Sequence, residues 1–201
     1  MIQLYDFLPS GNSYKVRLLM TQLGIPFERI DIDILKGETR TAEFLAKNSN
    51  GRIPLLELED GRYLAESNAI LWYLADGTNM LPSDAYERAQ VLQWLFFEQY
   101  SHEPYIATSR YWISILGKKA AYREALAQKR DPGYAALSVM DAHLKNHPFF
   151  VGSRYSIADI ALYAYTHVAH EGEFDLARFP AICAWLDRVS AQPRHIPITT
   201  A

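Results

Sequence analysis

The spacing of apolar residues changes once along the chain, near residue 80, and this change restricts the folds that the chain can adopt. Before it, segments with apolar side chains at every second position, which favour strands, alternate with segments that have the three-to-four-residue spacing of a helix. After it, only the helical spacing continues. The sequence therefore predicts an α/β unit of about 80 residues followed by an all-α unit of about 120.

The first unit is predicted over residues 1–80 with the element order βαβαββα. Asp60-Gly61 separates two short apolar runs and predicts a two-residue β-hairpin. Gly24 and Gly77 each follow a helical segment, and glycine in that position commonly ends a helix. The predicted strands are Ile2–Phe7, Phe27–Ile34, Pro54–Leu58 and Arg62–Leu64; the predicted helices begin after Ser10, span Ala42–Ala46 and run over Glu66–Asp76.

Residues 81–86 are predicted as a linker and residues 87–201 as the all-α unit. A kink is expected at Asp131-Pro132-Gly133, because proline disrupts helical hydrogen bonding. Ser156 and Asp159 fit a capping box, with Asp159 standing where Glu or Gln is usual, so this motif is expected to stabilise the fold. The predicted helices are Tyr86–Leu116, Ala120–Asn146, one that begins at Ser156, and Pro180–Ala191.

The sequence lacks the charge pattern of a nucleic-acid-binding protein and the apolar segments of a membrane protein. Its 20 basic and 23 acidic side chains give a net charge of −3 without a basic stripe, and charges interrupt each apolar stretch before the roughly 18 residues of a membrane span. The N-terminus carries no signal-peptide pattern. The single cysteine, Cys183, excludes an intramolecular disulfide, and the histidines show no metal-binding spacing. We therefore expect a soluble, cytoplasmic protein without a metal, a nucleic-acid partner or membrane association.

Four short motifs occur in a fixed order. Ser10–Arg17 lies where the first strand passes to the first helix, Ile53-Pro54 precedes a strand, Glu66–Ile70 opens the third helix, and Ser156–Asp159 opens a later one. Each is weak alone, but the ordered set, over essentially the whole chain, resembles the cytosolic glutathione transferases, in particular their serine-type classes (theta, phi and nu). The resemblance implies a thioredoxin-like fold for residues 1–80, an all-α helical bundle after them, glutathione as co-substrate without any other cofactor, and a homodimer.

Two of these motifs are expected to bind glutathione. An Ile-Pro bond at a strand start can be cis, which would expose the backbone of Ile53 to an extended peptide; the resemblance implies that Ile53 and Pro54 hold the cysteinyl part of glutathione. Ser67 can cap a helix and leave N–H groups for a carboxylate, and Glu66 can accept an ammonium; the resemblance implies that they bind the γ-glutamyl group. Alone, the motifs also fit a plain strand start and an ordinary N-cap.

The glycyl carboxylate of glutathione needs a cation, and Arg40 and Arg52 are the candidates. At both positions the chain departs from its relatives. Thr39 replaces a histidine that precedes lysine in some of them, and Arg52 replaces a glutamine that is found in many. Either arginine is equally well explained as a solvated surface side chain, so the choice between them stays open.

The resemblance places Ser10 where the serine-type classes donate a hydrogen bond to the glutathione sulfur, with Asn12 assisting it. Lowering a thiol pKa from about 8.5 by two units requires about 2.7 kcal/mol. A hydrogen bond to a charged group supplies about 1.5–3 kcal/mol and a helix N-terminus about 0.3–1 kcal/mol, so neither a metal nor a catalytic dyad is required. Tyr5 and Ser13 remain alternative donors, and Ser10 and Asn12 also fit plain turn and cap residues.

A hydrophobic co-substrate is expected at Tyr105, Tyr111 and Trp112, because the resemblance implies that the long first helix of the all-α unit faces the glutathione pocket. An aromatic stripe at helical spacing is also typical of a packed core. His102 and Arg110 on the same helix are candidates for polarising a leaving group.

Three functional hypotheses follow. The first is a glutathione transferase that conjugates glutathione to a hydrophobic electrophile by thiolate attack. The second is glutathione-dependent reduction of peroxides or disulfides at the same site, which Asn12 keeps open. The third is a non-catalytic binding protein with this fold, since a fold does not determine function. The joint presence of Ser10, Pro54, Glu66 and Ser67 favours an enzyme.

Overall fold

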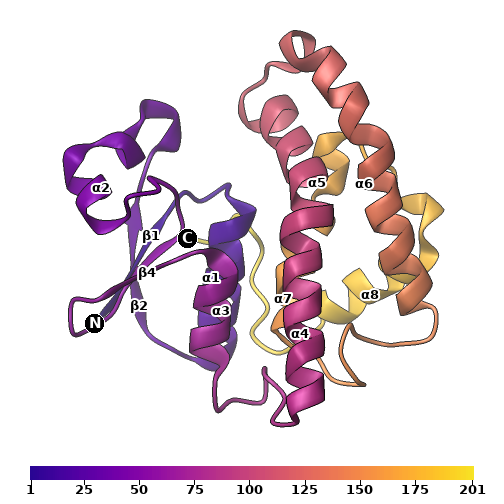
Figure 1. Ribbon diagram of the computed structural model, residues 1–201, viewed down its shortest axis with the longest axis horizontal. Coiled ribbons are helices and arrows are strands. Elements are labelled where there is room, and N and C mark those ends of the chain that lie inside the picture. The colour runs from indigo at the N-terminus through magenta and orange to yellow at the C-terminus, as the bar shows by residue number, and fades with distance from the viewer. The chain divides into compact units, whose positions relative to one another are not determined.

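A four-stranded mixed sheet forms the centre of the first unit in the computed structural model, which describes all 201 residues (Figure 1). The central strand β1 (Ile2–Asp6) pairs in parallel with β2 (Phe27–Asp31) and antiparallel with β3 (Leu55–Glu57). Strand β4 (Tyr63–Ala65) pairs antiparallel with β3, which gives the order β2-β1-β3-β4. The predicted element order is confirmed, and the predicted hairpin is present, but the connection between its strands, Leu58–Arg62, is longer than the two residues expected.

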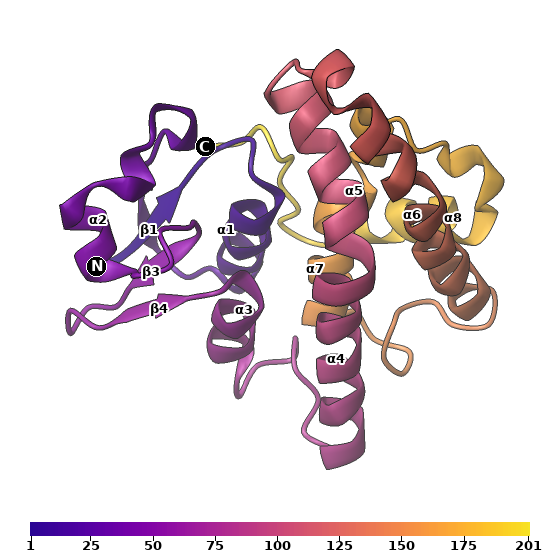
Figure 2. The ribbon, with the colours of Figure 1, turned by 45° about the horizontal axis from the view of Figure 1, so that its top comes forward.

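Three helices cover this sheet. Helix α2 (Ala42–Lys47) packs on one side, where Phe44 contacts Tyr5 and Leu55 in a buried cluster, and α1 (Gly11–Leu23) and α3 (Ser67–Ala75) lie together on the other side (Figure 2). Helix α1 ends at Gly24, which adopts φ +70°, a left-handed conformation that glycine reaches without strain. Helix α1 follows β1 and α3 follows β4, and since these two strands run in the same direction, both helices begin at the same end of the strands.

The C-terminal segment Pro193–Ala201 belongs to the first unit, whereas the sequence prediction assigned it to the all-α unit. The first unit comprises Met1–Asp76 with this segment, and the second comprises Gly77–Gln192, so residues 81–86 are part of the second unit as well. Side chains of α1 hold the segment by hydrogen bonds to its backbone carbonyls. Since every residue carries a carbonyl, no side-chain pattern revealed this attachment.

The second unit consists of helices, as predicted, but its first helix is not uniform. The predicted helix over 86–116 is a run in which two short π-helical turns, Glu98–His102 and Tyr111–Ile115, follow α4 and α5. Pro132 lies inside α6 and does not end it. The helices are α4 (Ala85–Phe97), α5 (Glu103–Arg110), α6 (Arg123–Leu144), α7 (Ile157–Thr166) and α8 (Pro180–Ser190).

Helix α7 is the core of the second unit, because all ten of its residues are buried. It begins with the predicted capping box. The Ser156 hydroxyl accepts a hydrogen bond from the backbone of the first turn, and the Asp159 carboxylate accepts one from the Ser156 N–H. Asp159 also accepts hydrogen bonds from the Phe150 N–H at 3.1 Å and from the Trp185 indole N–H at 3.0 Å. Burial raises the pKa of Asp159 to about 6, although these hydrogen bonds favour the charged form and oppose the shift.

Asp159→Ala is expected to lower the free energy of unfolding by about 3 kcal/mol or more, because several buried N–H donors lose their acceptor at once. Urea unfolding followed by circular dichroism measures this change. Asp131→Ala, at an exposed position on α6, is the matched control and is expected to change stability by less than about 0.5 kcal/mol. Equal effects of the two substitutions would contradict the role assigned to Asp159.

Candidate functional site

Ser10 lies at the N-terminus of α1, immediately after the turn that follows β1. It is the N-cap residue, and its Oγ accepts a hydrogen bond from the Ser13 N–H at 3.3 Å. A hydroxyl that accepts in this way still has its own proton to donate, and no group of the chain receives it. Ser10 therefore presents a free O–H donor at the positive end of a helix.

The two alternative donors are placed differently. The Tyr5 hydroxyl donates to Glu57 Oε2 at 2.6 Å and accepts from Lys47 Nζ at 2.7 Å, and burial, followed by the bond to Glu57, raises the pKa of Tyr5. The Ser13 side chain is completely buried. Neither hydroxyl is thus available to a ligand as Ser10 is.

The N-terminus of α3 differs in detail from the sequence prediction. Glu66, with φ +69°, is the N-cap, and Ser67 is the first residue of the helix, so Ser67 does not cap it. The N–H groups of Ser67 and Ala69 have no acceptor in the chain, and the exposed Glu66 carboxylate has no partner. A helix N-terminus with free N–H groups beside a free carboxylate suits a ligand that carries both a carboxylate and an ammonium.

The hydroxyl of Ser67 joins α3 to α1. It accepts from Lys15 Nζ and donates to Asn12 Oδ1, both at 3.3 Å. Lys15 is completely buried, and sequence reasoning missed it although it stands inside the first motif. Lysine is rarely buried, so nothing in the sequence distinguished it from a surface residue. A buried ammonium behind the start of α3 adds to the positive potential there.

Ile53 and Pro54 directly precede β3 and are joined by a cis peptide bond, the isomer that the sequence left possible. The N–H and C=O of Ile53 form no hydrogen bond within the chain. The adjoining loop is fixed by Asn48, whose side-chain amide donates to the Arg52 carbonyl at 2.8 Å. The unpaired backbone of Ile53 is therefore held in place beside a strand.

The two candidate cations border the same loop. Arg40 donates from Nη1 to the Asn50 carbonyl at 3.1 Å and lies against Gly51, where a Cβ would come within 2.5 Å of its guanidinium. The exposed side chain of Arg52 has no partner in the chain. Of the two, Arg52 has all of its side-chain donors free.

In the second unit, the aromatic residues predicted for a co-substrate separate into two groups. Lys129 of α6 lies over the rings of Tyr105 and Trp112, 5.6 and 5.3 Å from their centroids, and Trp112 stacks on Tyr122 at 4.4 Å. Tyr111 makes none of these contacts. Tyr105 and Trp112 thus pack toward α6.

The two candidates for polarising a leaving group serve the helical packing instead. His102 is fully buried, with Nε2 2.9 Å from the Thr166 hydroxyl. Arg110 is 5% exposed and donates from Nε to Glu171 at 2.8 Å. Both are therefore bound within the helical unit.

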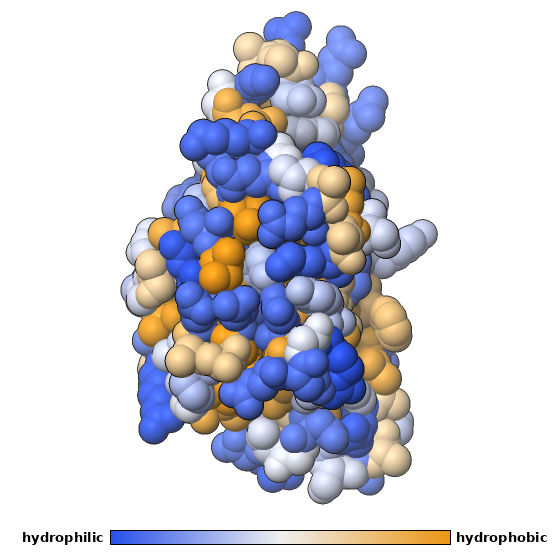
Figure 3. Space-filling model, turned by 90° about the vertical axis from the view of Figure 1, so that its left-hand side faces the viewer, coloured by the Kyte–Doolittle hydropathy of each residue, from blue (hydrophilic) through white to orange (hydrophobic).

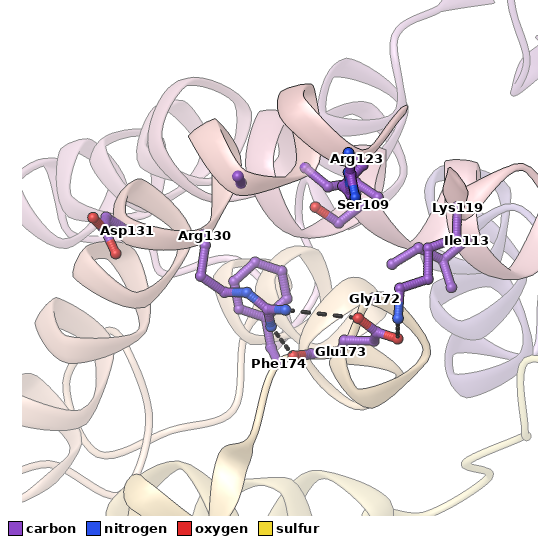
Figure 4. Close-up of a pocket in the computed structure, with 11 residues that line it drawn as sticks. Ser109, Ile113, Lys119, Arg123, Arg130, Asp131, Gly172, Glu173 and Phe174 are labelled. Atoms are coloured by element: carbon purple, nitrogen blue, oxygen red, sulfur yellow. Dashed lines mark hydrogen bonds and ion pairs between the residues drawn. The ribbon is translucent and has the colours of Figure 1, made fainter. Parts of the chain in front are cut away.

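The second unit also contains a cavity of about 480 Å³. Figure 4 shows Lys119 and Arg130 directed at Glu173, which pairs with them at 2.5 and 3.6 Å. The apolar part of the lining includes Ile113 and Phe174. None of the residues predicted for the site lines this cavity, and two of its three cations are already paired.

The face seen in the space-filling view of Figure 3 is mainly hydrophilic, with hydrophobic residues in small separate groups. No helix has both the length and the apolar character that crossing a bilayer requires. No three His, Cys, Asp or Glu side chains are grouped so that they could hold a metal ion.

Comparison with known proteins identifies the family. Residues 1–76 match the N-terminal domain of glutathione S-transferase and residues 94–193 match its C-terminal domain. The chain therefore belongs to the glutathione S-transferase family, and the predicted thioredoxin-like unit followed by a helical unit is confirmed.

Three similar proteins illustrate the range of this family. A crystal structure of a glutathione S-transferase from Pseudomonas fluorescens is 55% identical, with a TM-score of 0.97 over 99% of both chains. The disulfide-bond oxidoreductase YfcG of Escherichia coli is 31% identical over 96% of this chain and 92% of its own. A glutathione transferase from Burkholderia graminis, solved with two glutathione molecules bound per subunit, is 29% identical, with a TM-score of 0.84 over 96% of this chain and 85% of its own.

Tyr5→Phe is expected to lower the free energy of unfolding by about 1 kcal/mol, because Glu57 and Lys47 lose the hydroxyl that they share. Chemical denaturation measures the loss. Tyr73→Phe, at a half-exposed position on α3, is the control and is expected to be neutral. If Tyr5→Phe is as stable as the wild type, the hydroxyl is not the structural group described above.

Proposed function

We propose that this chain binds glutathione in its first unit and holds the glutathione thiol as a thiolate through a hydrogen bond from Ser10. The observation that carries the proposal is that one unit presents an unpaired strand backbone at Ile53, a free carboxylate beside free helix N–H groups at Glu66 and Ser67, and a free hydroxyl donor at Ser10. Glutathione has a matching group for each of the three: a peptide backbone, an end that carries both an ammonium and a carboxylate, and a thiol.

The binding roles follow from these groups. The cysteinyl backbone pairs with the N–H and C=O of Ile53 as an added strand, beside Pro54. The γ-glutamyl carboxylate takes the free N–H groups at the start of α3, and its ammonium takes Glu66. Lys15 and Asn12 hold the Ser67 hydroxyl in place. Arg52, with Arg40 beside it, supplies the cation for the glycyl carboxylate.

To lower the pKa of the thiol by two units from about 8.5, the site must stabilise the thiolate by about 2.7 kcal/mol. The Ser10 hydrogen bond supplies about 1.5–3 kcal/mol, and the N-terminus of α1, at which Ser10 lies, supplies about 0.3–1 kcal/mol. No metal is required. The resulting thiolate attacks a hydrophobic electrophile, for which we propose a site near Tyr105, Tyr111 and Trp112 on the helical unit.

Reduction of disulfides or peroxides by glutathione is the second candidate reaction. It is favoured by the similarity to the disulfide-bond oxidoreductase of E. coli and by the presence of Asn12, the residue through which the family resemblance keeps this reaction open. Both reactions begin with the same bound thiolate, which suits the cytoplasm, where glutathione is kept reduced. A purely binding role would leave the free Ser10 donor without a use.

Ser10→Ala is expected to raise the pKa of the bound glutathione thiol by up to about two units and to reduce turnover at neutral pH by up to about 25-fold, because the thiolate loses its donor and a smaller fraction of the thiol is ionised. Retention on glutathione-agarose is expected to stay nearly unchanged, since the other contacts remain. The measurement is the pH dependence of turnover with an aryl halide, a hydroperoxide and a mixed disulfide, which also identifies the reaction.

Two variants keep this experiment interpretable. Ser138→Ala, on an exposed turn of α6, is the matched serine control and is expected to behave as wild type. Should Tyr5→Phe raise the thiol pKa while Ser10→Ala leaves it unchanged, the donor is Tyr5 and the assignment of Ser10 is wrong.

We also propose that the protein is a homodimer, as is usual in its family. Leu92, Phe96 and Tyr100 lie four residues apart along α4 and the following π turn, and thus on one helix face. They are exposed in the single chain, Phe96 by 69% and Tyr100 by 84%. Large exposed apolar side chains that are grouped in this way commonly mark an interface.

Phe96→Asp is expected to shift the protein from dimer to monomer, because a buried, unpaired carboxylate would be costly at the interface. Light scattering measures the mass, with 23.0 kDa as the value for one chain. Val139→Asp, which replaces a half-exposed apolar residue on α6, is the control. A wild-type protein that scatters as one chain at micromolar concentration contradicts the proposal.

A further inference from the structure

The buried guanidinium of Arg17 joins two segments that are far apart in the sequence. Its Nη1 lies 2.5 Å from Asp6 Oδ2, and its Nη2 donates to the carbonyls of Leu8 at 2.9 Å and Ile198 at 2.8 Å. Its Nε has no partner. A buried charge depends on having its hydrogen bonds satisfied, so each of these three acceptors matters. One of them belongs to the C-terminal segment.

Tyr14 binds the same segment one helical turn earlier. Its hydroxyl donates to the Ile196 carbonyl at 2.7 Å and lies 3.3 Å from His195 Nε2. Tyr14 and Arg17 are three residues apart and share one face of α1, and both are completely buried. The segment 195–198 therefore covers this face of the helix.

The path of the segment leads to the turn before α1. Arg194 lies against Gly24 at the C-terminal end of α1, where a Cβ would come within 2.6 Å of its guanidinium. Four residues later, the Ile198 carbonyl accepts a hydrogen bond from Arg17 Nη2, which also donates to the Leu8 carbonyl. The segment thus runs along α1 from its C-terminal end to the turn that precedes its N-terminus.

That turn positions Ser10. The Ser10 N–H donates to the Phe7 carbonyl at 2.7 Å, and the Leu8 carbonyl between them is held by Arg17. The Ser10 carbonyl accepts from the Tyr14 N–H at 2.9 Å. The backbone of Ser10 is therefore held on one side by the turn that the Arg17 side chain binds and on the other by the first backbone hydrogen bond of α1, and the side chains of Arg17 and Tyr14 both bind the C-terminal segment.

We propose that residues 195–198 are a positioning element for the reaction, which hold the Phe7–Ser10 turn in place through Arg17 and Tyr14 and so aim the Ser10 hydroxyl at the glutathione sulfur. The inference rests on the function proposed above for Ser10. Arg17 and Tyr14 do not touch the ligand; they act through Ser10. Displacement of a reacting group by about 1 Å reduces a rate by as much as about 100-fold, so a modest loosening of the turn is measurable.

The test uses the full chain with Tyr14→Phe, which removes only the hydroxyl that binds the segment. The pH profile of kcat/KM is expected to shift to higher pH, with an about 5-fold loss at neutral pH, the equivalent of one hydrogen bond. Glutathione affinity by calorimetry is expected to change less than about 2-fold, because the contacts with the peptide remain. Tyr73→Phe is the matched control.

A double-mutant cycle distinguishes positioning from mere stabilisation. If the segment acts through Ser10, Tyr14→Phe has no further effect on the pH profile in a Ser10→Ala background. An unchanged profile for Tyr14→Phe alone, or an equal shift in both backgrounds, overturns the inference and leaves the role of Ser10 intact. If Ser10→Ala itself leaves the profile unchanged, the proposed function has failed, and the inference fails with it.

Two shortened chains provide an independent comparison. A chain that ends at Arg194 lacks both carbonyl acceptors and is expected to show a larger shift of the pH profile than Tyr14→Phe. A chain that ends at Thr199 retains the carbonyls of Ile196 and Ile198 and is expected to match the full chain. Equal profiles for the two chains count against the proposal. If the shorter chain does not fold, the Tyr14→Phe cycle gives the decision.

Discussion

The buried ion pair between Asp6 and Arg17 is the interaction on which the first unit depends most. It ties the last residue of the central strand β1 to the middle of α1, with both side chains at most 1% exposed. Removal of one partner of such a pair typically costs about 3–5 kcal/mol, because the other charge is left buried alone. The Asp6 backbone carbonyl also accepts from Ile32 at 2.7 Å, so one residue secures both the sheet edge and the turn that carries Ser10.

Helix α1 carries a second buried cation that serves the other half of the site. Lys15 points to Ser67 at the start of α3, whereas Arg17 points to Asp6 and the C-terminal segment. One helix therefore supports both the group assigned to the sulfur and the group assigned to the γ-glutamyl end. The positions of both proposed groups therefore depend on α1.

Local patterns predicted most of the fold but only part of the site. The hairpin at Asp60-Gly61 and the helix end at Gly24 were predictable because Gly61 and Gly24 adopt positive φ, which the sequence shows directly as glycine. The roles at the start of α3 were not predictable, because Glu66 occupies the N-cap position and the Ser67 hydroxyl accepts a hydrogen bond from Lys15. The bonds from Lys15 to Ser67 and from Arg17 to Ile198 span 52 and 181 residues, and no local spacing encodes such contacts. The π turns were missed because they change hydrogen bonding and not composition.

The chain passes between its two units twice, after Asp76 and again after Gln192. A gene fragment for residues 1–76 therefore omits part of the unit that it is meant to encode. Since Met1 and Ala201 both belong to that unit, a circular permutation that joins them by a linker and opens the chain between Gln192 and Pro193 makes the unit one uninterrupted stretch of polypeptide. In that order it becomes a cassette that can be exchanged between relatives.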